Sequence, residues 1–200
     1  MRFSGLALLA ALAFTAPVAA QSAHHLQAEE NVGINPRYLL QDPHGRSVTN
    51  EDFRGRFQLI AFGYTYCPDV CPTTLVEMAA ILKQLGDQAE RLQPIFITVD
   101  PERDTRKVLR TYTEFFDPRI LSLTGSPALV RRAADNFKIR YAKVREPGSD
   151  NYAVDHSAGM FLLGPDGSFI KKFAFATPVD QIAAQIQETL AAAPVAPSRR

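Results

Sequence analysis

FQLIAFGYTYCPDVCPTT, residues 57–74, decides the fold of this 200-residue chain. Its first part, residues 57–64, is a short and nearly continuous apolar run, as expected of a strand buried on both faces of a sheet. Its second part holds the only two cysteines of the chain, Cys67 and Cys71. From Pro72 onward, apolar residues recur at spacings of three and four, which is typical of one helix face, and Pro72 suits a first helical turn. A buried strand, a cysteine pair and a helix therefore follow one another directly.

The chain continues with further strands and helices. Residues 94–99 form a second buried-strand candidate, and a helix is expected from Thr105 with Asp104 as its cap. The inward face of that helix is predicted to hold Val108, Leu109, Tyr112, Phe115 and Phe116. Ser126 and Pro127 open the next helix, because serine caps a helix and proline presets its first turn.

The C-terminal part predicts a hairpin and a final helix. Residues 160–163 and 169–173 read as antiparallel strands around a tight turn, and a helix should start at Thr177-Pro178. A strand at 140–144 and a small leading hairpin around 42–45 complete the pattern. The order favours an α/β fold, a thioredoxin-like three-layer sandwich whose mixed central sheet has helices on both faces. A fold shared so widely does not settle function.

The chain divides into four parts. Residues 1–20 have a basic start, an apolar run and small residues at the end, which is typical of a secretory signal peptide; an uncleaved membrane anchor is the alternative. Residues 21–36 are interpreted as a flexible lead-in, residues 37–193 as one domain, and residues 194–200 as a flexible tail. We expect a monomer.

Export would place the domain in an oxidising compartment such as the periplasm, where two cysteines can form one disulfide bond. Residues 1–20 contain one basic and no acidic residue, which leaves 21 of each sign in the remainder. This neutral balance gives no support to nucleic-acid binding.

The cysteine pair carries the chemistry. Cys67 and Cys71 each precede a proline, which favours a turn leading into the helix rather than helix proper. Cys71 would lie at the positive end of the helix, where the macrodipole favours a thiolate and lowers the thiol pKa. Thioredoxin-like enzymes have two residues between their cysteines; the three present here allow both sulfurs to act as ligands on one side of an ion. Soft thiolates select Cu(I), and an added imidazole also suits Cu(II).

His156 is the candidate imidazole. It lies in the polar stretch 151–157, and in a thioredoxin-like topology the loop before the C-terminal hairpin faces the loop after the first buried strand. We therefore expect His156 to approach the two sulfurs, with Asp155 or Asp69 orienting the ring.

Each residue also has a simpler interpretation. The cysteines could form a structural disulfide, and His156 taken alone could be a surface or capping residue. The adjacent histidines His24 and His25 are interpreted as part of a solvated tail, and Met78 and Met160 as core residues. The segment 100–105 is interpreted first as a strand exit and helix cap, with a role near the metal as the alternative. A zinc site is a further alternative, although only three strong protein ligands are visible, against the four usual in structural sites.

Three motifs together resemble the Sco/SenC family: residues 62–75 (FGYTYCPDVCPTTL), 99–105 (VDPERDT) and 154–157 (VDHS). The resemblance implies a thioredoxin fold and one copper ion, Cu(I) or Cu(II), held by Cys67, Cys71 and His156. It also implies assembly of the binuclear copper centre of cytochrome c oxidase, with the copper-accepting subunit of the oxidase and an upstream periplasmic copper donor as partners.

Two hypotheses follow. The first is a periplasmic copper metallochaperone. The second is a thiol-disulfide oxidoreductase in which Cys67 and Cys71 are the redox-active pair and reduce the cysteine pair of a partner; it makes no demand on His156. Against the second, the predicted loop facing the cysteines lacks the cis-proline usual in thioredoxin-like reductases. A peroxiredoxin-like activity is a weaker third.

Overall fold

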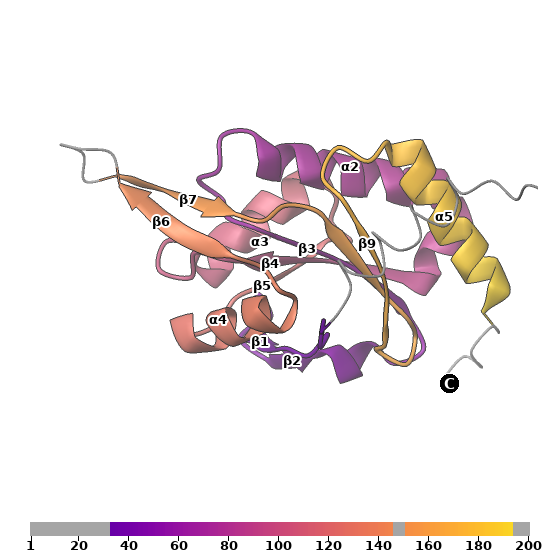
Figure 1. Ribbon diagram of the computed structural model, residues 1–200, viewed down its shortest axis with the longest axis horizontal. Helices are drawn as coiled ribbons and strands as arrows, with labels where there is room; N and C mark the ends of the chain where they lie inside the picture. Colours follow the sequence, from indigo (N-terminus) through magenta and orange to yellow (C-terminus); the bar gives the residue numbers. More distant parts are fainter. Residues whose placement is uncertain (1–32, 146–150, 194–200) are drawn as a thin grey trace, which may run out of the picture. The chain divides into compact units, whose positions relative to one another are not determined.

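A computed structural model describes residues 33–145 and 151–193 of the chain. The predicted signal, most of the lead-in, the tail, His24 and His25 lie outside these residues. The helices and strands are arranged as Figure 1 shows. In chain order they are β1 (Leu39–Gln41), β2 (Ser47–Thr49), η1 (Asn50–Phe53), β3 (Phe57–Gly63), α2 (Val70–Leu85), η2 (Gly86–Arg91), β4 (Leu92–Thr98), α3 (Arg106–Phe116), β5 (Leu121–Leu123), α4 (Pro127–Asn136), β6 (Tyr141–Arg145), β7 (Tyr152–His156), β8 (Met160–Leu163), β9 (Phe169–Phe173) and α5 (Val179–Ala192).

The central sheet has the strand order β5-β4-β3-β8-β9. Its middle strand, β3, is buried at all seven positions, as its continuous apolar sequence predicts. β3 pairs in parallel with β4, and with β8 in antiparallel fashion. The predicted hairpin of β8 and β9 is also present. The sheet is therefore mixed, and the two cysteines follow its central strand.

Helices cover both faces of this sheet. The connections β3-α2-β4 and β4-α3-β5 both step toward the same edge, and right-handed crossovers in one direction place their helices on one face. α2 accordingly contacts α3 and also α5, whereas α4 contacts β1 in the opposite layer (Figure 1). The predicted thioredoxin-like sandwich is confirmed.

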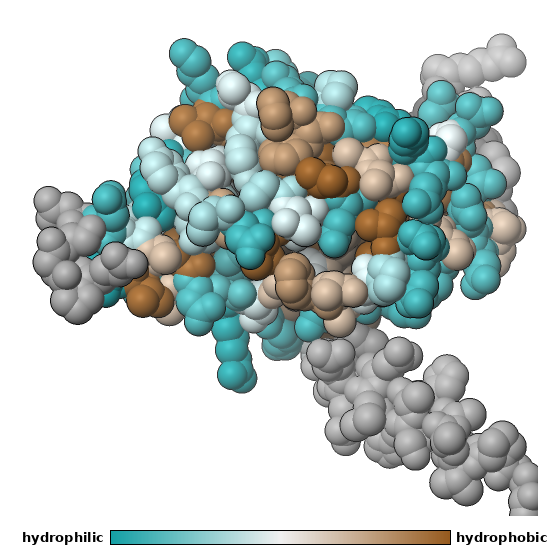
Figure 2. Space-filling model, turned by 90° about the horizontal axis from the view of Figure 1, so that it is seen from above, coloured by the Kyte–Doolittle hydropathy of each residue, from teal (hydrophilic) through white to brown (hydrophobic). Residues whose placement is uncertain are grey.

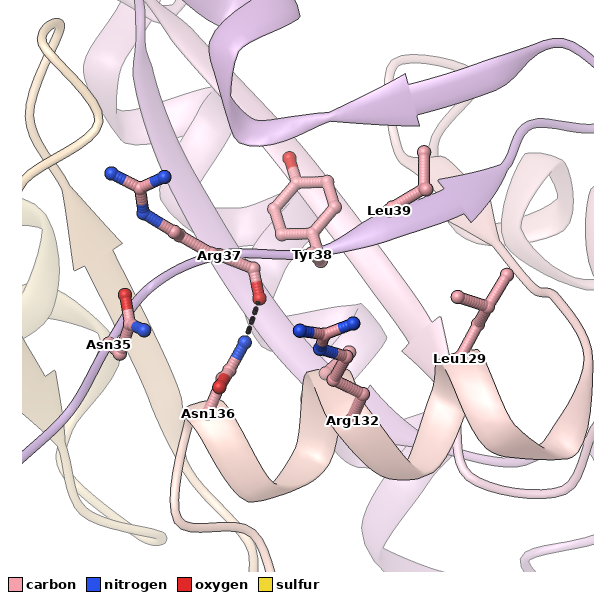
Figure 3. A pocket seen from close by; sticks show the side chains of 8 residues that line it. Asn35, Arg37, Tyr38, Leu39, Leu129, Arg132 and Asn136 are labelled. Atoms are coloured by element: carbon pink, nitrogen blue, oxygen red, sulfur yellow. Dashed lines mark hydrogen bonds between the residues drawn. The ribbon is translucent and has the colours of Figure 1, made fainter.

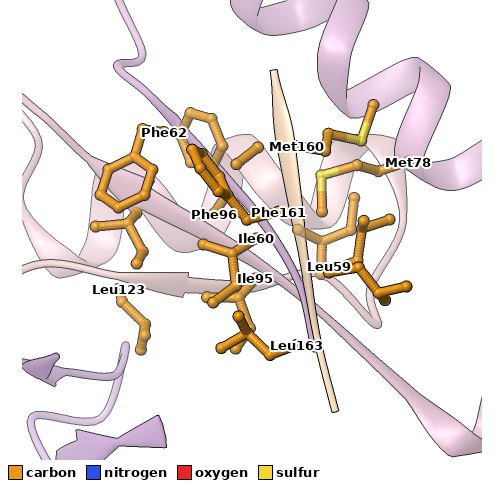
Figure 4. Close-up of a cluster of buried hydrophobic side chains, with 14 of the residues drawn as sticks. Leu59, Ile60, Phe62, Met78, Ile95, Phe96, Leu123, Met160, Phe161 and Leu163 are labelled. Carbon is orange, nitrogen blue, oxygen red and sulfur yellow. The ribbon is translucent and has the colours of Figure 1, made fainter. Parts of the chain in front are cut away.

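The core lies between the sheet and these helices. Figure 4 shows Ile60 of β3 beside Phe161 of β8, and Leu59 of β3 on the side where Met78 lies. Met78 of α2 and Met160 of β8 are buried here, which confirms their interpretation as core residues. Each large apolar side chain removed from water contributes roughly 1.5–3 kcal/mol, so the sheet that positions the site is firmly held.

Helix α3 departs from its prediction in two respects. Its N-cap is Thr105, whose hydroxyl accepts a hydrogen bond from the Val108 amide at 3.3 Å, and not Asp104. Leu109 is buried, but Val108 is 40% exposed and Phe115 is 84% exposed. The buried face of α3 is narrower than the face that its apolar residues predict. Part of the predicted inward face is therefore exposed to solvent. Figure 2 shows that exposed apolar side chains also lie among hydrophilic ones on the face seen from above.

A hairpin occupies the segment expected to be a loop around His156. β7 pairs with β6 in antiparallel register, with Tyr141 opposite His156, and the two strands form a separate two-stranded sheet. In Figure 1 they extend beyond the helices. The alternation Tyr152, Val154, His156 is the period of a strand with one face inward. The polar residues Asn151, Asp155 and Ser157 in and beside the strand concealed that pattern.

Candidate metal site

Cys67 lies in the turn between β3 and α2. Its amide donates to the Tyr64 carbonyl at 3.3 Å, which closes the turn after the strand. The Cys71 amide donates to the Cys67 sulfur at 3.4 Å, so this sulfur accepts one of the backbone donors that a helix start leaves unpaired. Cys67 is partly buried, with the exposed Tyr66 beside it. Cys67 is therefore the more exposed of the two cysteines.

Cys71 lies within the first turn of α2, which begins at Val70. The prediction of a turn before the helix is correct for Cys67 and wrong for Cys71. The restriction that Pro72 places on its predecessor is only a bias, and a proline in the first turn costs no helical hydrogen bond.

The predicted direction of the Cys71 pKa is also wrong. Burial raises the pKa of the Cys71 thiol, and the neighbouring Cys67 and Asp104 raise it further, against a hydrogen bond with the Tyr64 backbone. Only 1% of Cys71 is exposed. Loss of hydration therefore outweighs the helix terminus as an influence on this thiol.

His156 is the last residue of β7 and meets the cysteines across 85 positions of sequence. Its Nε2 lies 3.4 Å from the Cys71 sulfur. The ligand atoms of Cys67, Cys71 and His156 all lie within 4.8 Å of one another. Metal–sulfur and metal–nitrogen bonds of about 2.0–2.3 Å fit such a triangle with one ion between the three atoms. The predicted convergence of these three residues is therefore present.

The imidazole is oriented by backbone rather than by a carboxylate. Nδ1 of His156 lies 3.0 Å from the carbonyl oxygen of Ser157, which directs Nε2 toward Cys71 when Nδ1 carries the proton. Asp155 and Asp69 are both exposed, and neither has a hydrogen bond to His156 among the described residues. The expectation that either one orients the ring is wrong. A carbonyl fixes the tautomer as well as a carboxylate but adds no charge.

Asp104 is hydrogen-bonded to the turn that holds Cys67. Its carboxylate is fully buried and accepts hydrogen bonds from the Thr65 hydroxyl at 2.6 Å, the Thr65 amide at 3.1 Å and the Thr98 hydroxyl at 2.7 Å. Burial raises the pKa of Asp104, against these hydrogen bonds from Thr65 and Thr98. Asp104 thus ties the residue two before Cys67 to the end of β4.

Sequence reasoning gave Tyr152 no role at the site, and it considered Arg103 only as part of the segment 100–105. The Arg103 guanidinium lies 3.7 Å from the ring centroid of Tyr152 and 4.7 Å from that of Tyr66. The alternating pattern of 152–156 was the available signal for Tyr152. For Arg103 the available signal was its place in the motif 99–105, whose first interpretation is a strand exit and helix cap.

Two surface pockets differ in their relation to the site. One of about 360 Å³ borders the imidazole and is lined by Arg140, Tyr141, Ala142, Asp155, His156 and Ser157. Another of about 240 Å³ lies between α4 and the segment before β1, where Figure 3 shows Arg37 and Arg132. Asn136 donates to the Arg37 carbonyl at 2.7 Å there. Neither sulfur nor imidazole lines this second pocket, so it lies apart from the site.

The fold and the site define a class: a thioredoxin-like protein in which two cysteines three residues apart meet a distant histidine. Residues 26–191 match the SCO1/SenC family. An SCO2-like protein of Rickettsia felis is 38% identical over 146 residues, 72% of this chain and 71% of that protein. The chain belongs to the SCO1/SenC family.

Solved structures agree with this assignment. The structure of Arabidopsis thaliana ScoI with copper bound is similar with a TM-score of 0.74 and 33% identity, over 79% of this chain and 98% of that one. A structure of BsSco, described by its disulfide switch and as a member of the Sco family of cytochrome c oxidase assembly proteins, has a TM-score of 0.62 and 27% identity over 81% of this chain and 96% of that one.

Some relatives are longer than the matched part. The human mitochondrial SCO2 homologue is 37% identical over 163 residues, which cover 80% of this chain and 61% of that protein. Within residues 33–145 and 151–193, no helix has the length and apolar character needed to cross a membrane.

Proposed function

We propose that this protein is a copper metallochaperone that binds one copper ion through Cys67, Cys71 and His156 and helps to assemble the binuclear copper centre of cytochrome c oxidase. The convergence of three soft or borderline ligand atoms within 4.8 Å carries this proposal. Two thiolates and an imidazole suit Cu(I) and Cu(II). Copper bound to the Arabidopsis relative, and the oxidase-assembly role given to BsSco's family, support the same assignment.

Transfer of the copper cargo follows from the exposure of the ligands. Cys67 and His156 are partly exposed, whereas Cys71 is buried. A thiolate of the copper-accepting oxidase subunit can approach from the open side and replace one ligand at a time. Copper then passes between proteins by ligand exchange without release into solvent. An upstream donor would load the site by the reverse exchange.

Export to the periplasm is part of the proposal. The basic start, apolar run and small residues of positions 1–20 support a signal peptide there. Mass spectrometry of the protein recovered from periplasmic extract should give a chain lacking this segment. A protein that remains in the membrane fraction with residues 1–20 attached would instead indicate an anchor.

The main experiment is an anaerobic copper titration of the reduced, folded domain. Wild-type protein should bind one equivalent of Cu(I) and of Cu(II), the latter with thiolate charge-transfer absorption. Cys67→Ser and Cys71→Ser should each weaken that absorption, the double variant should remove it, and His156→Ala should lower the Cu(II) affinity at least about tenfold. His44→Ala is the control, because His44 lies exposed in the turn between β1 and β2. Copper binding that is unaffected by all three site variants would refute the proposal.

Thiol-disulfide exchange is the second candidate, favoured by one observation: Cys67 is accessible and Cys71 is buried beside it. The Cys67 thiolate would attack a partner disulfide and release one partner thiolate, which takes up a proton. The Cys71 thiolate would then attack the mixed disulfide at Cys67, which releases the second partner thiol. The partner is reduced by two electrons, and the Cys67–Cys71 pair is oxidised to a disulfide.

An exchange assay separates the two candidates. With an oxidised dithiol peptide as substrate, the redox hypothesis expects stoichiometric reduction by wild type and normal turnover by His156→Ala. The copper hypothesis expects His156→Ala to fail in copper transfer.

Against the redox role, no described residue has a cis peptide bond, and Gly159 occupies the loop where reductases place their cis-proline. Gly159 has φ 122°, and a Cβ there would lie 2.6 Å from the Phe173 carbonyl oxygen.

A further inference from the structure

The β6–β7 hairpin holds His156 but has little support of its own. Four of the five β6 residues are exposed, and Val154 is the only fully buried residue of β7. An isolated two-stranded hairpin is marginally stable in water. The position of His156 relative to the sulfurs therefore depends on the contacts that attach β7 to the rest of the domain.

Arg103 makes two of these contacts from one side chain. Its Nη1 donates to the Tyr152 carbonyl oxygen at 2.9 Å, and its guanidinium stacks on the Tyr152 ring at 3.7 Å. The same guanidinium lies over Tyr66, the residue before Cys67, at 4.7 Å. Arg103 thus touches the strand that ends in His156 and the turn that holds Cys67.

Asp100 anchors Arg103 in this position. The Asp100 carboxylate is fully buried, forms an ion pair with Arg103 Nε, and accepts a hydrogen bond from the Tyr152 hydroxyl at 2.8 Å. The Arg103 side chain is only 20% exposed. A buried carboxylate without a cation raises the free energy of the folded state. If the Arg103 side chain moved away, the Asp100 carboxylate would either stay buried without its cation or have to become exposed to solvent.

The turn after β4 therefore links both halves of the site. Asp104 ties Thr65 of the cysteine turn, and Asp100 with Arg103 ties Tyr152 of β7. Tyr64 adds one further link, because its hydroxyl accepts a hydrogen bond from the Val154 amide at 3.2 Å. These contacts span both ligand-bearing segments.

We propose that Arg103 is a positioning residue that holds β7 against the cysteine turn and thereby keeps His156 beside Cys67 and Cys71. The role of Arg103 in copper binding rests on the proposed function, whereas its role in holding β7 rests on the contacts of its side chain. Arginine is required because its planar fork serves a carboxylate, a carbonyl and two aromatic rings at once; lysine has one compact charge.

The test compares Arg103→Gln and Arg103→Lys with wild type in the folded domain below its melting temperature. Arg103→Gln should lower the Cu(II) affinity about tenfold, in the range seen for residues that orient metal ligands. The Cu(II) affinity of Arg103→Lys should lie between those of wild type and Arg103→Gln. Arg119→Gln is the matched control, because Arg119 also pairs with an aspartate, Asp117, at a site apart from the hairpin.

A double-mutant cycle distinguishes positioning from a general structural effect. In the His156→Ala background, Arg103→Gln should cause no further loss of Cu(II) affinity, because the imidazole it positions is gone. An equal loss in both backgrounds, or wild-type Cu(II) affinity and spectrum in Arg103→Gln, would overturn the inference.

Hydrogen exchange in the metal-free protein gives an independent answer. The Val154 amide should exchange faster in Arg103→Gln than in wild type or Arg119→Gln. If His156→Ala leaves copper binding unchanged, the proposed ligand set fails, and this exchange rate alone decides whether Arg103 holds β7. An unchanged Val154 rate in Arg103→Gln would then refute the positioning role.

Discussion

Gly63 is the last residue of β3 and lies next to the buried thiol of Cys71. A Cβ at this position would lie 2.7 Å from the Cys71 sulfur and 2.8 Å from the Phe96 ring. Real Cβ atoms do not approach other atoms so closely, and both neighbours are buried. The glycine is therefore needed for space beside Cys71, not for an unusual backbone angle.

Gly63→Ala should destabilise the domain by about 1–3 kcal/mol, because overpacking forces Cys71 or Phe96 to move. It should also weaken copper binding, since Cys71 is one proposed ligand. Urea unfolding and the copper titration measure the two effects. Gly125→Ala, whose Cβ would lie 3.2 Å from Leu40 away from the site, should have the smaller effect on stability and none on copper affinity. Equal behaviour of the two variants would contradict this account.

Among the elements, α5 shows how a neighbour completes a helix end. Arg91, the last residue of η2, donates to the Leu190 carbonyl at 2.7 Å and to the Ala193 carbonyl at 3.2 Å. A helix leaves its last carbonyls without partners, and a cation there also meets the negative end of the macrodipole. Arg91 thereby fastens the C-terminal helix to the segment between α2 and β4.

Arg91→Met should lower the free energy of unfolding by about 1–2 kcal/mol, because two charge-assisted hydrogen bonds are lost while the aliphatic stem remains. Arg91→Lys should lose less. Lys107→Met, which removes an exposed cation from α3, serves as the control and should change stability little. Thermal or urea unfolding decides, and wild-type stability of Arg91→Met would show that solvent caps α5 equally well.

The elements also differ in how far their sequences predicted them. β3 and the β8–β9 hairpin were predicted because apolar runs and a turn sequence are local signals. Of the β6–β7 hairpin only β6 was predicted, because Asn151, Asp155 and Ser157 made the segment of β7 resemble a polar loop. The exposure of Phe115 escaped prediction because periodicity marks a helix face without saying how wide a neighbour covers it.

At the scale of the whole molecule, buried carboxylates give the folding free energy a dependence on pH. Burial alone would raise the pKa of Asp42, but hydrogen bonds from Arg46 and the His44 amide outweigh it and lower that pKa. A lowered pKa in the folded state contributes stability above the ordinary pKa of about 4, and this contribution disappears as the pH falls through the folded-state value. Asp104 has the opposite sign: its raised pKa means that it favours folding less once it ionises.

Asp42→Asn should therefore cost about 2 kcal/mol at pH 7, where the ionised carboxylate accepts its hydrogen bonds. The difference from wild type should shrink as the pH falls below 4, because protonated Asp42 no longer favours its donors. Urea unfolding of metal-free protein between pH 3 and pH 7 measures it. A difference that stays constant over this range would show that shape, not charge, makes Asp42 important.

Local patterns in the amino-acid sequence predicted the thioredoxin-like elements, the cysteine pair after the central strand and the third candidate ligand, His156. These follow from local patterns of apolar residues, turn residues and motifs. The tertiary structure alone decided that Nε2 of His156 lies 3.4 Å from Cys71, that burial raises the pKa of Cys71, and that Arg103 joins the two ligand-bearing segments. Hydration loss and side-chain contacts depend on what distant segments place around a residue, and no local pattern contains that information.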